Sequence, residues 1–114
     1  MKKIAFATSD GVHIDQQFQR ASRLAVYQLD ATGPRHDQTF TFAPDRSLRT
    51  EVRLEAIGGA AIVVGTVFGP SSVARLAQRG IRAATARPGT RIAELLARLA
   101  GLEREAHMPG PKPR

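Results

Sequence analysis

The chain has 114 residues, of which 42% are hydrophobic, and a formal net charge of +7. This size and composition predict one globular domain, and no run of about 18 apolar residues is present that could form a transmembrane helix. The absence of cysteine excludes disulfides, thiolate nucleophiles, and zinc or iron–sulfur sites built on cysteine.

The first element is an unbroken apolar run at residues 4–7, which predicts a strand covered on both faces. The run is too short for the hydrophobic region of a signal peptide, so we expect a cytoplasmic protein. The residues TSDG at 8–11 then end the strand with small, turn-forming side chains. Because open α/β sheets bind ligands at the carboxyl ends of central strands, this loop is the first candidate site.

Four more strands are expected downstream. Residues 24–29 and 38–42 predict an antiparallel hairpin with two phenylalanines on one face. An unbroken apolar run at residues 60–64 predicts a further buried strand, and residues 81–85 predict a short fifth strand.

Three helices are expected at about residues 45–57, 70–80 and 90–104. Asp45 or Ser47 would cap the first of them. The expected buried stripes are Leu48, Val52 and Ala56 or Ile57 in the first helix, and Val73, Leu76 and Ala77 in the second.

These elements predict one α/β domain over residues 1–104, with three layers and a five-stranded mixed sheet flanked by about three helices. The hairpin makes part of the sheet antiparallel, whereas the helical crossovers make the rest parallel. Residues 105–114 are rich in proline and poor in apolar side chains, which predicts a disordered tail.

The loop after the first strand contains Ser9, Asp10 and His13, followed by Gln17 and Arg20. A histidine flanked by hydroxyls, amides and an arginine can bind a metal or an anion. In the alternative interpretation, Ser9 and Asp10 only close a turn and His13 is a solvent-exposed loop residue. The residues alone somewhat favour that alternative, because a single histidine is a weak signal.

A second loop, at residues 65–72, connects a predicted strand to a helix and includes Thr66, Gly69 and Ser71. The amino terminus of such a helix presents free N–H groups to an anion, although the lysine-containing pattern of phosphate-binding P-loops is missing. The glycines also fit a simple tight turn. Both loops are expected at the same edge of the sheet, where they would face one another.

Enzyme functions find little support, and we expect a non-enzymatic protein. No GxSxG nucleophile elbow is present, and no group of carboxylates is placed to hold two metal ions. The net positive charge fits an anionic partner, and GC-rich codon usage explains it equally well. Nucleic acid is an improbable partner, because few aromatic side chains accompany the arginines.

Three segments show a family resemblance: ATSDG at residues 7–11, IDQQFQRA at 14–21 and LAVY at 24–27. They resemble the strand, turn and loop motifs of the dinitrogenase iron–molybdenum cofactor-binding family, whose NifX-type carriers are also found fused to cofactor-synthesis proteins. Downstream, the same pattern is followed by Gly59-Ala60, Gly65, Gly69, Leu76 and Gly80-Ile81. The resemblance extends over about residues 2–100.

The resemblance implies a ribonuclease-H-like fold without nuclease activity. It also implies that the protein carries iron–molybdenum cofactor, or its iron–sulfur precursor, as cargo between nitrogenase assembly proteins. A preassembled anionic cluster requires a positive pocket and one or two exchangeable ligands. In this interpretation His13 is the metal ligand, Arg20 is a charge partner, and Asp10, Gln17 and Gly69 line the pocket with the hydrogen-bond donors Ser9, Thr66 and Ser71.

The chain departs from the family motif at two positions, where Gln17 replaces a histidine and Gln19 replaces a glycine. An amide is a poorer ligand for iron than an imidazole. His13 could replace the missing histidine only if the loop coils back, because an extended segment separates it from Gln17 by about 13 Å. Two alternatives follow, namely a relative that has lost the cluster and binds proteins, and a basic nucleic-acid-binding domain.

Overall fold

The computed structural model describes the backbone of residues 2–43 and 49–107. Its main sheet has the strand order β4-β3-β1-β5-β6, which is 3-2-1-4-5 when these strands are counted along the chain. The strands are β1 (Lys2–Thr8), β3 (Arg23–Asp30), β4 (Gly33–Thr41), β5 (Ile62–Gly65) and β6 (Arg82–Thr85). β3 runs antiparallel to β1 and β4, whereas β5 runs parallel to β1 and β6. The predicted five-stranded mixed sheet is confirmed.

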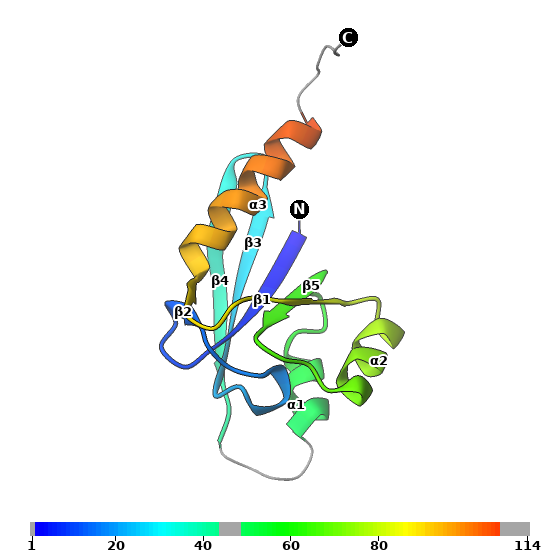
Figure 1. Cartoon of the computed structure of the whole chain (residues 1–114). Helices are drawn as coiled ribbons and strands as arrows, with labels where there is room; N and C mark the ends of the chain where they lie inside the picture. The colour runs from blue at the N-terminus through cyan, green and yellow to red at the C-terminus, as the bar shows by residue number, and fades with distance from the viewer. Residues whose placement is uncertain (1, 44–48, 108–114) are drawn as a thin grey trace.

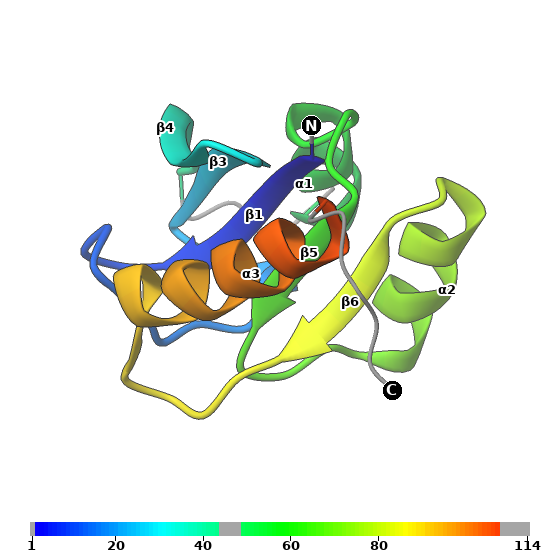
Figure 2. The same cartoon turned by 90° about the horizontal axis from the view of Figure 1, so that it is seen from above.

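Three helices cover the two faces of this sheet, as Figures 1 and 2 show. They are α1 (Arg49–Ala56), α2 (Pro70–Gln78) and α3 (Ile92–His107). Side chains of β1 alternate between two hydrophobic cores. Ala5 and Ala7 pack in the core that includes residues of α1 and α2, whereas Ile4 and Phe6 pack in the core beneath α3. The small alanines and the larger side chains thus follow the two-residue period of a strand buried on both faces.

The predicted buried stripes of the first two helices are correct in part. Leu76 in α2 is buried, and so is Ile57, directly after α1. Val52, Val73 and Ala77 are exposed, and the further buried positions are Arg53, Leu54 and Ser72. Both helices are short, so the neighbouring sheet and loops decide which side is buried. Leu48 and the candidate caps Asp45 and Ser47 lie outside the described residues.

Three short elements lie outside the predicted strands and helices. β2 (His13–Ile14) and β7 (Thr90–Arg91) form a separate two-stranded antiparallel sheet. A 3-10 helix, η1 (Phe18–Arg20), completes the loop that follows β2. A strand of two residues has no detectable periodicity, so pattern reasoning cannot find it.

The last helix is longer than predicted. α3 continues to His107, past the expected domain end at residue 104, and residues 108–114 of the predicted tail lie outside the described residues. None of the helices in the described part of the chain has the length and apolar character needed to cross a bilayer.

Candidate functional site

The two candidate loops begin at the same edge of the sheet. β1 and β5 are parallel neighbours, with Phe6 opposite Val64, so the loops after Thr8 and Gly65 leave the sheet side by side. Thr66 N donates to Gln16 O at 3.0 Å, which joins the two loops directly. The prediction that these loops face one another is confirmed.

The first loop starts with a turn built around the buried Thr8 hydroxyl. Thr8 Oγ1 accepts a hydrogen bond from Gly11 N at 2.9 Å. Gly11 has a φ of 79°, in the left-handed region that favours glycine. The turn therefore needs both the hydroxyl and the glycine of the TSDG motif, and it reverses the chain toward β2.

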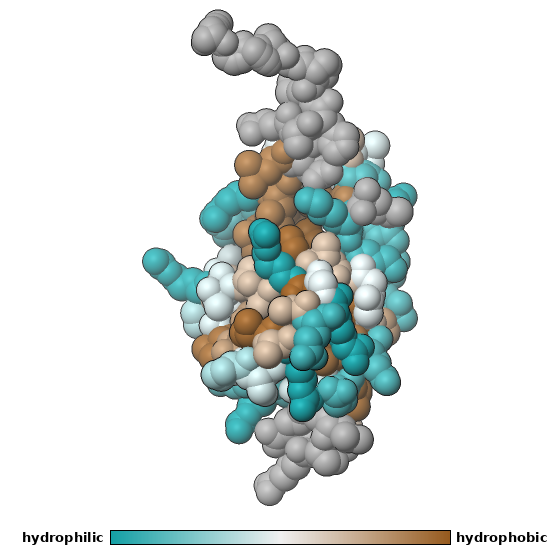
Figure 3. Space-filling view, turned by 90° about the vertical axis from the view of Figure 1, so that its right-hand side faces the viewer, coloured by the Kyte–Doolittle hydropathy of each residue, from teal (hydrophilic) through white to brown (hydrophobic). Residues whose placement is uncertain are grey.

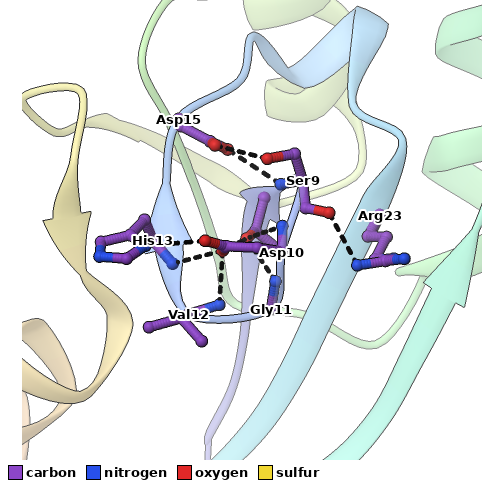
Figure 4. Close-up of polar contacts among 8 residues, drawn as sticks. Ser9, Asp10, Gly11, Val12, His13, Asp15 and Arg23 are labelled. Carbon is purple, nitrogen blue, oxygen red and sulfur yellow. Dashed lines mark hydrogen bonds and ion pairs between the residues drawn. The ribbon is translucent and has the colours of Figure 1, made fainter.

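Asp10 organises the next part of the loop. Its Oδ1 accepts hydrogen bonds from Val12 N and His13 N, each at 2.8 Å. Its Oδ2 lies 2.8 Å from His13 Nδ1 (Figure 4). The His13 ring and these backbone N–H groups hold the pKa of Asp10 well below its ordinary value. Asp10 is therefore ionised and can only accept hydrogen bonds.

This contact fixes the orientation of the His13 ring. Because the Asp10 carboxylate only accepts, Nδ1 of His13 carries the proton in this pair. Nε2 makes no hydrogen bond to any residue that the structure describes, and the side chain is 39% exposed. Metal-binding histidines commonly donate their second ring N–H to a carboxylate in this way. In the neutral form of this ring, Nε2 of His13 can therefore take one coordination position on a metal.

Ser9 is held by residues to which sequence reasoning assigned no role. Its N and Oγ donate to the carboxylate of Asp15 at 2.9 and 2.5 Å. Arg23 Nη1 donates to Ser9 O at 2.7 Å (Figure 4). The Ser9 hydroxyl is therefore engaged within the loop and is not free to bind a ligand as predicted. No local motif signals the pair, because Ser9 and Asp15 lie six positions apart.

The second group of predicted residues surrounds the amino terminus of α2. Phe18 N donates to Val67 O at 3.4 Å, and the Phe18 ring stacks on Phe68 with centroids 5.9 Å apart. A Cβ atom on Gly65 would lie 3.2 Å from Gln16 O, so a larger residue there would force the loops apart. Thr66 is half-buried beside them.

The two glutamines that replace the family's histidine and glycine contact each other. Gln19 Nε2 donates to Gln17 Oε1 at 3.3 Å, and it would lie 3.6 Å from a Cβ atom on Gly69, the residue that precedes α2. Gln19 Oε1 is buried without a hydrogen-bond partner. The amide pair thus fills the position of the motif's histidine and leaves one polar atom unsatisfied.

The predicted site residues therefore form two groups. Ser9, Asp10 and His13 belong to one, and Gln17, Thr66 and Gly69 to the other, and no hydrogen bond or ion pair joins the groups within residues 2–43 and 49–107. Arg20 and Ser71 are exposed at the end of η1 and in the first turn of α2. His13 lies in the extended β2, so the loop does not coil back to place it at Gln17.

Metal coordination by this chain alone is limited. Among the described residues, no group of three or more histidine, aspartate or glutamate side chains is placed to hold a metal ion. Since a structural metal site in a protein typically uses about four ligands, any metal at His13 must bring most of its ligands with it.

The low pKa of Asp10 leads to a prediction about acid stability. A carboxyl group whose pKa is lowered by folding stabilises the protein above its ordinary pKa of 3.8, and this contribution is lost as the pH falls toward the folded pKa. The Tm of Asp10→Asn is therefore expected below that of the unchanged protein at about pH 5–7. The difference should narrow steadily below about pH 4. Thermal unfolding followed by circular dichroism measures it, and a difference independent of pH would contradict the role given to Asp10.

The chain matches one protein family in its sequence and known structures in its fold. A family model described as dinitrogenase iron-molybdenum cofactor matches residues 1–101. Among solved structures, the protein PH0822 has a TM-score of 0.72 at 16% sequence identity, with 89% of this chain and 90% of that chain covered. The apo form of the orange protein from Desulfovibrio gigas has a TM-score of 0.66 at 17% identity, with 90% of each chain covered. No curated protein matches. At these identities the solved structures establish a shared fold.

Proposed function

Because the chain belongs to the dinitrogenase iron–molybdenum cofactor family, we propose that it is a non-enzymatic carrier of a preformed metallocluster. The cargo is iron–molybdenum cofactor or its iron–sulfur precursor, which the protein receives from and passes to nitrogenase assembly proteins in the cytoplasm. The observation that carries this proposal is the contact between Asp10 and His13, which orients Nε2 of His13 outward at the sheet edge.

A single imidazole suits a carrier better than a complete ligand set does. A cluster that arrives assembled already has its sulfide bridges, so it requires only one or two exchangeable protein ligands. His13 supplies one such ligand, and the contact with Asp10 fixes the orientation of its ring. The chain lacks cysteine, so no thiolate competes for the iron. The net charge of +7 attracts an anionic cluster over a distance comparable with the Debye length.

The test is an anaerobic titration of the purified protein with isolated cofactor and, separately, with the precursor cluster, followed by gel filtration and iron analysis. We expect iron to elute with the protein, and His13→Ala to weaken retention at least tenfold, which corresponds to about 1.4 kcal/mol. His36→Ala is the matched control, because His36 lies on β4 with its Nε2 2.8 Å from Thr39 Oγ1. Equal retention by the two variants would remove His13 from the proposal.

The contact between Gln17 and Gln19 favours a second candidate function, a family member that no longer binds the cluster and instead binds a protein. The amide pair occupies the position where the family motif has its histidine and glycine, and it closes the space beside Gly69. In this case the folded protein and the cluster would elute separately.

The double variant Gln17→His with Gln19→Gly separates the two functions. It restores an imidazole ligand and opens the space beside Gly69. If the natural chain has lost the cluster, the double variant is expected to gain retention in the same titration. If the natural chain is a carrier through His13, the double variant should add little, and His13→Ala should remain the variant with the larger effect.

A further inference from the structure

A groove lies on the α3 side of the sheet, next to the first candidate loop. Its volume is about 730 Å³, within the range of about 300–1,000 Å³ typical of small-molecule sites. One wall is α3, and the other consists of Tyr27 and Pro34 from the hairpin of β3 and β4. Figure 2 shows α3 lying across this face of the sheet, with the loop of residues 9–12 beside its first turn.

The lining of the groove is apolar along α3. Ile92, Leu96 and Ala100 are buried in the core at its base, and the small side chains of Ala93 and Ala97 leave its wall open. From Ile92 to Ala100 the helix rises by about 12 Å, at about 1.5 Å per residue. The groove is therefore long enough for a slender apolar ligand.

Among the described residues that line the groove, Arg91 alone is charged, and it lies at one end of the groove. The arginine immediately precedes α3, and Gly11 and Val12 line the same end because Ile92 N donates to Val12 O. The side chain of Arg91 forms no ion pair or hydrogen bond with any described residue. By contrast, Arg98 on the same helix pairs with Glu94 at 3.1 Å. One end of the groove thus carries a positive charge, and its other walls are apolar. Such a groove is complementary to a ligand that has an anionic head group and an apolar body.

We propose that this groove binds a small amphipathic anion, with an aliphatic or aromatic body along α3 and a carboxylate or similar head group on Arg91. The head group pairs with the planar guanidinium through two parallel hydrogen bonds, and the body displaces water from Leu96 and Val12. His13 lies opposite Arg91 in the β2–β7 sheet, so the groove opens beside the proposed cluster ligand without including it.

Two other surfaces of the described residues differ from this groove. On the face that carries α2, hydrophilic and hydrophobic residues are interspersed (Figure 3). A second cavity between β6 and α3 is lined by Arg87 and Arg98, but Glu94 lies in it and already pairs with Arg98. That cavity is lined mostly by polar and charged side chains, so it offers no apolar wall for the body of a ligand.

The proposal is tested by NMR titration of the ¹⁵N-labelled protein with octanoate and with the neutral alcohol octanol. We expect octanoate to shift amide signals along α3 and at Gly11 and Val12. Arg91→Gln should weaken octanoate binding about tenfold and leave octanol binding unchanged, since only the acid uses the charge. Ala97→Phe, which fills the groove from an exposed position, should abolish binding of both ligands.

Arg98→Gln is the matched control, because it removes an arginine from the same helix outside the groove. His13→Ala should leave octanoate binding unchanged, so this result and the outcome of the cluster titration are independent. Equal effects of Arg91→Gln and Arg98→Gln, or shifts outside the groove, would overturn the proposal. It would also be overturned if the groove signals moved with protein concentration alone, since a second copy of the chain would then cover the groove.

Discussion

Replacing Phe18 with alanine is expected to lower the free energy of unfolding by about 3–5 kcal/mol, the usual cost of removing a fully buried phenylalanine ring. Phe18 is 0% exposed, belongs to the core shared with α1 and α2, and stacks on Phe68. Since domains of this size are stable by about 5–15 kcal/mol, the variant should be close to unfolding at physiological temperature. Urea denaturation followed by circular dichroism measures the change.

Val67→Ala is the control for this experiment. Val67 accepts the hydrogen bond from Phe18 N through its backbone oxygen, and its side chain is 49% exposed. Truncation should therefore preserve the contact between the loops and change stability by less than about 0.5 kcal/mol. Similar losses in the two variants would show that Phe18 does not anchor the candidate site to the core.

Arg53→Met is expected to lower the free energy of unfolding by about 2–4 kcal/mol, because it removes a buried charge-assisted contact and leaves a buried carbonyl without its donors. Arg53 is 6% exposed, and its Nε and Nη2 both donate to Ala21 O, at 3.1 and 2.5 Å. Its guanidinium carbon lies 4.5 Å from the ring centroid of Phe42, which adds a cation–π contact. Methionine retains the apolar volume but provides no donor.

The comparison for Arg53 is Arg75→Met on α2. Arg75 pairs with Glu51 at 2.7 Å, but both side chains are nearly half exposed, so the pair contributes less than about 1 kcal/mol. Arg53→Lys should give an intermediate loss, since lysine keeps the charge but cannot reproduce the planar fork. If Arg53→Met were no more destabilising than Arg75→Met, Arg53 would not fix the end of the candidate loop at Ala21.

The sequence by itself determined the sheet and the position of the loops. Unbroken apolar runs identify the central strands β1 and β5, because only strands covered on both faces lack polar alternation. Turn residues mark their carboxyl ends, and parallel neighbours bring those ends to one edge. The hairpin of β3 and β4, and the packing of Phe40 and Phe42 on the core, follow from the same periodicity. The motifs at residues 7–11, 14–21 and 24–27 also indicated the family that the comparison then showed.

Only the tertiary structure decided which of the candidate residues meet. Pairing of β2 with β7 places Arg91 opposite His13, although neither two-residue strand has a readable pattern. Arg53 is buried, although its charge predicts an exposed side chain. Its partners, the Ala21 carbonyl and the Phe42 ring, come from distant parts of the chain, so local sequence does not indicate this burial. The period of apolar residues along the sequence indicates local secondary structure. Contacts between distant parts of the chain decide which face of a short helix is buried and which loop residues share a site.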